Sequence, residues 1–134
     1  MKNKTFWMAF VAIYIVGQAA GFLVHQVLLA DSYQALAHLW RPEAEMMSMM
    51  WMMFATGAIY SFFFCLIYAL GFAGNGVAGG VKYGLLIGLF MSVPMAIDSY
   101  VVYPIPSGLA LSWMISGVVM FVIYGAIVGA IYKR

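Results

Sequence analysis

Charged residues are scarce in this sequence. It has six Lys or Arg and four Asp or Glu among 134 residues, a formal net charge of +2. So small and scattered a charge cannot steer DNA or RNA to the protein, and we expect no nucleic-acid partner. The chain also has a single cysteine, which excludes an internal disulfide framework. These two shortages exclude nucleic-acid binders and disulfide-rich secreted scaffolds.

Apolar residues fill most of the chain instead. Hydrophobic residues make up 66% of it and aromatic residues 17%. A soluble domain of this size needs far fewer apolar residues for its core. Four bilayer-spanning helices of about 20–22 residues would use almost all of them. The composition therefore predicts an integral membrane protein that lies in the lipid bilayer.

Four long apolar stretches divide the chain. A polar segment follows the first stretch, and short segments rich in glycine or proline follow the second and third. None of the stretches alternates as the strands of a membrane barrel do. We therefore expect one all-α domain over residues 1–134, a compact bundle of four transmembrane helices. The expected spans are residues 6–30, 46–70, 81–103 and 109–132, with an outer loop at 31–45.

The basic residues indicate how these spans are oriented. Four crossings bring five of the six basic residues to one side of the membrane: Lys2, Lys4, Lys82, Lys133 and Arg134. The acidic residues fall on or towards the other side, together with Arg41. The positive-inside rule then places both termini in the cytoplasm. We expect a multi-pass protein of a bacterial-type inner (plasma) membrane, with its first span retained as an anchor.

The two halves of the chain share a short pattern. Gly17-x-x-x-Gly21 precedes Asp31-Ser32-Tyr33, and Gly84-x-x-x-Gly88 precedes Asp98-Ser99-Tyr100 at the same spacing. A duplication would give two tandem helical hairpins related by an axis along the membrane normal. The alternative is coincidence in a sequence of few residue types.

Small residues recur at four-residue spacing, which lets membrane helices approach closely. We expect the third and fourth spans to meet along such glycines, and the same glycines could instead join copies of the chain. The candidate packing residues are Gly17, Gly21, Gly84, Gly88, Gly125 and Gly129.

A group of polar residues falls in the outer half of the spans. Asp98 needs a partner or a proton there, because an ionised carboxylate is costly in a membrane, and His25 and Arg41 are its candidate partners. Pro94 removes a helical hydrogen bond and is the candidate hinge. The alternative for Asp98 is an interfacial residue that reaches water. The candidate ligand- or ion-binding residues are His25, Asp98, Gln18, Arg41, Ser112 and Ser116.

Methionine is concentrated at the start of the second span. Met46, Met49, Met50 and Met53 share one helix face. Thioethers suit copper(I), and His25 or His38 would add a nitrogen ligand. The two histidines leave haem as a further alternative. The simpler interpretation is that methionine is a flexible apolar filler, and we expect no cofactor.

No catalytic motif is recognisable, so we expect a non-enzymatic protein. The first hypothesis is an accessory or assembly subunit, or a homo-oligomer, that acts through glycine-rich helix contacts with itself or with other membrane subunits. The second is a small carrier or channel with an outer site around His25 and Asp98. The third is a copper(I)-handling membrane protein that uses the patch Met46–Met53.

Overall fold

A computed structural model describes residues 3–132, and this part of the chain is helical without any strand. Its four long helices are each long and apolar enough to cross a membrane. The predicted all-α architecture with four helices that are able to span a membrane is therefore confirmed for these residues. The long helices are α1 (Asn3–Phe22), α3 (Glu43–Gly71), α4 (Gly76–Val102) and α5 (Ser107–Ile131).

The first span changes its helix type before it ends. After Phe22 the chain continues as a π-helix, η1 (Leu23–Leu28), so that the continuous helical segment runs from Asn3 to Leu28. Short π-helical insertions often occur at functional sites, and this one contains His25. The sequence did not predict the π-helix, because the residues that flank it are apolar on every face of the helix.

The expected outer loop is largely helical. It contains the short helix α2 (Ala30–Ala35) and a 3-10 turn, η2 (Ala37–Leu39), before Pro42 precedes α3. At the other end, α3 and α4 are joined by a glycine turn. Gly74 and Gly76 have φ values of 92° and 64° there, a left-handed conformation that glycine adopts without strain.

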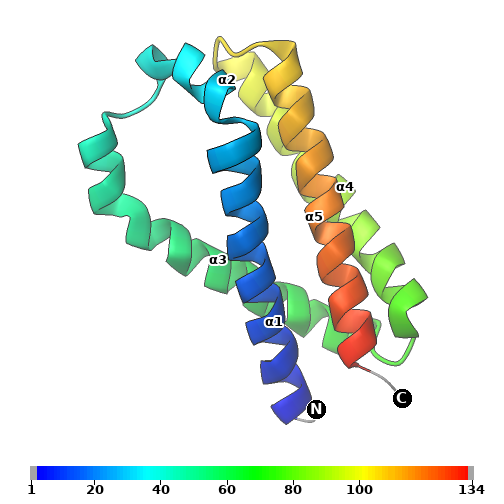
Figure 1. The fold of residues 1–134 in the computed structure, drawn as a ribbon. Coiled ribbons are helices and arrows are strands. Elements are labelled where there is room, and N and C mark those ends of the chain that lie inside the picture. The colour runs from blue at the N-terminus through cyan, green and yellow to red at the C-terminus, as the bar shows by residue number, and fades with distance from the viewer. Residues whose placement is uncertain (1–2, 133–134) are drawn as a thin grey trace.

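Helices α4 and α5 form a close antiparallel pair along glycines (Figure 1). A Cβ atom on Gly84 would collide with the backbone carbonyl of Phe121, and one on Gly80 or Gly125 would collide with the other glycine's carbonyl. The two backbones thus touch where the side chains are missing, which is how small residues bring membrane helices together. The expected contact between the third and fourth spans lies at these residues.

Helices α1 and α3 are arranged differently. They cross obliquely, and the first half of α3 runs away from the other helices (Figure 1). Gly57 marks the crossing, because a Cβ atom there would meet the side chain of Gln18. The two halves of the chain therefore differ in packing, and the bundle is open on the side of α3 rather than compact throughout.

The main core closes the end at which α1 begins and α5 ends, which we call the termini end. It is formed by buried residues from all four long helices: Phe6, Ala9, Ile13, Phe64, Cys65, Tyr68, Tyr83 and Val128. The Tyr83 hydroxyl donates a hydrogen bond to the carbonyl of Phe64 over 2.7 Å. The aromatic packing at this end holds α3 to the rest of the bundle.

The opposite end, which we call the α2 end, has a smaller core. Ile105, Leu109 and Ala110 at the start of α5 are buried there under residues of the 29–40 segment. This packing fixes α2 and η2 to α5, and α3 starts without such support.

The charged residues are distributed between these two ends. Lys4 in the first turn of α1 and Lys82 near the start of α4 lie towards the termini end, and Arg41 and Asp98 lie towards the α2 end. Lys2, Lys133 and Arg134, which also support the expected orientation, lie outside the described residues.

Candidate functional site

Three aromatic side chains meet at the α2 end. The Tyr33 hydroxyl lies 2.6 Å from Nδ1 of His25 and accepts a hydrogen bond from Nε1 of Trp113 over 2.7 Å. An indole nitrogen only donates, so the hydroxyl hydrogen of Tyr33 is free to be donated to His25. In that arrangement the imidazole is neutral and carries its proton on Nε2. The hydroxyl of Tyr33 thus connects the first span to α5.

The same tyrosine is held through its backbone. Nε1 of Trp40 donates a hydrogen bond to the Tyr33 carbonyl over 3.1 Å, and the two rings pack edge to face at 5.8 Å. Burial raises the pKa of Tyr33 above its usual value, and the hydrogen bond from Trp113 partly opposes this shift. Tyr33 is therefore a neutral hydrogen-bonding group over the physiological pH range.

Asp98 is not part of this network. Its side chain is exposed on α4, and within residues 3–132 it forms no hydrogen bond or ion pair. Arg41 pairs instead with Glu45, at 3.4 Å and with both side chains exposed. Exposed pairs of this kind contribute little to stability. The binding role of Asp98 therefore stays a prediction, and no contact with its candidate partners supports it.

The two candidate serines of α5 are occupied by their own helix. The Ser112 hydroxyl donates to the carbonyl of Gly108 over 2.8 Å, and the Ser116 hydroxyl donates to that of Ser112 over 2.7 Å. Such bonds to the preceding turn are common for serine in membrane helices. Pro94 lies inside α4, which continues through it without interruption.

The methionine patch is spread along the free part of α3. Met46, Met49 and Met53 are exposed there, and Met50 is half-buried. His38 lies exposed in η2. Among residues 3–132 no group of three or more His, Cys, Asp or Glu could hold a metal ion. The copper(I) and haem hypotheses therefore stay predictions.

A central cavity of about 400 Å³ lies between α1, α3, α4 and α5. It brings together four of the candidate residues, namely Gly17, Gln18, His25 and Met53. Tyr14, Gln18 and His25 of the first apolar helix share this wall. The volume lies within the range of small-molecule sites.

Several residues of the cavity escaped sequence analysis. Thr56, Ser92, Met120 and Tyr124 line it, and each comes from a helix whose apolar residues show no preferred face. In a membrane span both the lipid and the interior are apolar, so hydropathy does not distinguish the two faces. The Tyr33 hydroxyl was missed for another reason, because it lies in the segment expected to be a loop.

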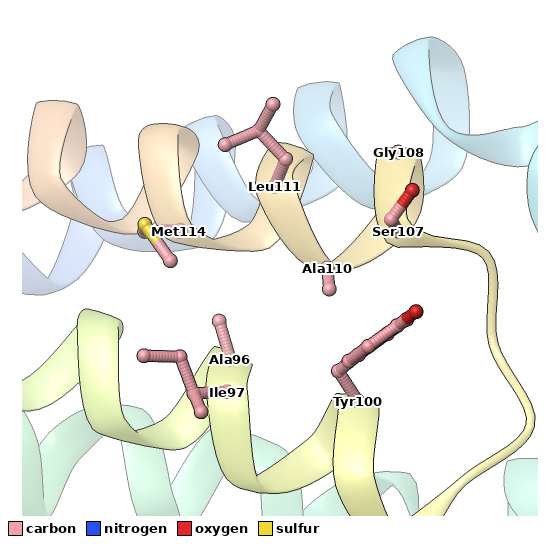
Figure 2. Close-up of a pocket in the computed structure, with 8 residues that line it drawn as sticks. All are labelled: Ala96, Ile97, Tyr100, Ser107, Gly108, Ala110, Leu111 and Met114. Carbon is pink, nitrogen blue, oxygen red and sulfur yellow. The ribbon is translucent and has the colours of Figure 1, made fainter.

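A second hollow is a groove of about 370 Å³ between the end of α4 and the start of α5. Figure 2 shows that the hydroxyls of Tyr100 and Ser107 lie at its loop end, and that the rest of the wall is carbon apart from the sulfur of Met114. Small residues at Ala96, Gly108 and Ala110 leave this space. The groove has little polar chemistry and does not include Asp98.

Residues 3–132 form an all-α fold with four helices that are able to span a membrane, and a mainly apolar cavity with a few polar groups lies among these helices. No protein-family model, curated protein or solved structure matches the chain. The functional argument therefore depends on the residues of this chain.

Proposed function

We propose that the protein is a non-enzymatic, multi-pass integral membrane protein that acts by lateral association in the bilayer, as a homo-oligomer or as an accessory subunit of other membrane proteins. The observation that carries this proposal is the free first half of α3. Its large apolar side chains are uncovered by the rest of the chain, with exposed fractions from 37% to 67%: Met46, Met47, Met49, Trp51, Met52, Met53 and Phe54.

The uncovered segment differs from an ordinary lipid-facing helix. From Glu43 to Thr56 no residue is buried, although near the end of this stretch the Tyr14 hydroxyl donates a hydrogen bond to the Phe54 carbonyl and Met53 and Thr56 line the central cavity. By contrast, α4 and α5 bury one side of each other over most of their length. Methionine adapts its shape to a partner and is frequent at adaptable binding surfaces. This half of α3 therefore suits contact with another helix.

The glycine motifs mainly form contacts between helices of the same chain. Gly84 and Gly88 pack on α5, and Gly125 and Gly129 pack on α4. Gly17 faces the ring of Tyr124, and a Cβ atom on Gly21 would meet nothing within 4 Å. Lateral association therefore depends on the methionine-rich half of α3 rather than on the glycine contacts expected from the sequence.

Native mass spectrometry of the protein, extracted gently from its own membrane, tests the association. We expect a homo-oligomer or a complex with another membrane protein. The variant Met47→Ala/Trp51→Ala should dissociate it, and the control Leu86→Ala/Phe90→Ala, at exposed apolar sites on α4, should not. A monomer in every preparation, or equal loss in both variants, would refute the proposal.

The proposed orientation has both termini in the cytoplasm. Lys4 and Lys82 near the termini end support it through the positive-inside rule. Single cysteines at Asn75 and Ser107, introduced in a Cys65→Ala background, test it by labelling with a membrane-impermeant maleimide in whole cells. Ser107→Cys should react from outside and Asn75→Cys only after lysis, and the reverse pattern would overturn the orientation.

A further inference from the structure

The central cavity is built where α3 leaves the bundle. Its floor is formed by Phe64, Phe121 and Tyr124, which pack against the core of the termini end. Small residues keep it open, since Gly17, Gly57 and Gly117 all belong to its wall. The space therefore follows from the crossing of α1 and α3 and belongs to a single chain.

The wall holds hydrogen-bond donors without a partner. Within residues 3–132 neither the side-chain amide of Gln18 nor the hydroxyl of Tyr124 forms a hydrogen bond. Nδ1 of His25 is engaged with Tyr33, so its Nε2 is free for a further bond. A polar group left unpaired in apolar surroundings is costly. These groups therefore favour an occupant that supplies hydrogen-bond acceptors.

The occupant must be neutral. The residues of the described chain that line the cavity include no Asp, Glu, Lys or Arg, and the exposed carboxylate of Asp98 is not among them. A charged group placed there would lose its hydration without a counter-charge, at a cost of several kcal/mol or more. Phosphate and carboxylate head groups are therefore excluded as occupants.

The rest of the wall suits a ring. Thioethers of Met53, Met91, Met95 and Met120 come from three helices and line the same space as several aromatic side chains. Sulfur makes favourable contacts with aromatic rings, and methionine adapts to irregular shapes. A plain acyl chain would use these contacts less well and would offer no acceptor to the free donors.

We infer that this cavity binds a neutral, lipid-soluble ring compound that carries carbonyl groups. A carbonyl oxygen accepts a hydrogen bond from the Gln18 amide, and the ring lies among the methionine thioethers. The open side of the bundle lets such a compound enter from the membrane. The inference concerns the cavity of one chain and holds whether or not the chain associates with others.

Binding is measured by native mass spectrometry of the full chain in detergent, titrated with decylubiquinone as the ring probe. Two probes separate the chemistry: decylbenzene has a ring without carbonyls, and 1-decanol has a hydroxyl without a ring. Decylubiquinone should bind at one molecule per chain and at least tenfold more tightly than either. Equal binding of all three would overturn the inference, because the protein would then be recognising only an apolar chain.

Two pairs of variants place the probe in the cavity. Gln18→Leu should weaken decylubiquinone binding about fivefold to tenfold, which corresponds to one hydrogen bond, and Gln26→Leu on the exposed side of η1 should not. Thr56→Trp fills the cavity and should abolish binding, whereas Ser48→Trp, nearer the start of α3, should retain it.

Circular dichroism of each variant separates loss of binding from loss of the fold. Normal helix content with unchanged binding in both Gln18→Leu and Thr56→Trp would place the probe elsewhere and overturn the inference. If Thr56→Trp does not fold, the comparison of Gln18→Leu with Gln26→Leu still shows whether decylubiquinone binds in the cavity. Phosphatidylglycerol that displaces decylubiquinone would also count against it, because its head group is charged.

Discussion

Tyr33 and Trp113 are 80 residues apart in the chain and are joined by a hydrogen bond of 2.7 Å from the indole to the hydroxyl. The same hydroxyl reaches His25 in the first span. One oxygen atom thus holds together the end of the first span, the α2 segment and the start of α5. This is the main polar attachment at the end of the molecule where α3 is free.

Tyr33→Phe should therefore loosen the α2 end. The substitution leaves the nitrogens of His25 and Trp113 without this partner, which should lower the free energy of unfolding by about 1–3 kcal/mol. Unfolding in mixtures of SDS and dodecylmaltoside, followed by circular dichroism, measures the change. Tyr100→Phe is the control, because Tyr100 is exposed and forms no hydrogen bond among residues 3–132. Equal stability of the two variants would show that the network contributes nothing.

The contribution of Tyr33 should depend on pH. Burial raises its pKa in the folded protein, so the stabilising form is the neutral phenol. The stability advantage of the wild-type protein over Tyr33→Phe should be constant below about pH 10 and should be lost as the pH rises through the folded pKa. Unfolding titrations of both proteins at several pH values measure this difference. An advantage that grows with pH would contradict the assignment.

The glycine pair of α4 and α5 gives a third prediction. A Cβ atom on Gly84 would strike the carbonyl of Phe121, and backbone cannot move aside as a flexible side chain can. Gly84→Ala should therefore separate the two helices and destabilise the protein by about 1–3 kcal/mol. Gly21→Ala is the matched control, because open space surrounds that position and alanine favours helix, so stability should stay the same or rise. Equal effects in the same unfolding assay would show that the close helix contact is not stabilising.

Composition and span pattern were enough to predict the four helices and the meeting of α4 and α5 near their glycines. The sequence could not predict that the first half of α3 lies apart from the other helices. The hydropathy value of Met47 or Trp51 is the same whether the side chain faces lipid or the protein interior. The π-helix at His25 changes the register of the first span, and no residue pattern marks it. Of the candidate site residues, Gln18, His25 and Met53 meet at one cavity, whereas Asp98, Ser112 and Arg41 are engaged elsewhere or exposed.

Two tyrosines of the termini-end core give a fourth prediction. The hydroxyl of Tyr83 is bonded to the Phe64 carbonyl, whereas the buried hydroxyl of Tyr68 has no partner within the described chain. Tyr83→Phe should cost about 0.5–1.5 kcal/mol, because it removes a formed hydrogen bond. Tyr68→Phe should be neutral or stabilising, because it removes an unpaired polar group from apolar surroundings. The same unfolding assay compares them, and a larger loss in Tyr68→Phe would mean that its hydroxyl has a partner in the membrane.

Asp98 provides the final prediction, because its carboxylate belongs to the alternative site around His25 and Asp98. Its carboxylate is exposed and has no partner among residues 3–132, so Asp98→Asn should change the free energy of unfolding by no more than about 0.5 kcal/mol. If the protein acts by lateral association, the oligomer or complex seen by native mass spectrometry should also be unchanged. Asp31→Asn is the matched control, an exposed acid in α2 at the same end. A loss of assembly or of stability in Asp98→Asn alone would show that the carboxylate has a partner that the protein needs, and would contradict the prediction.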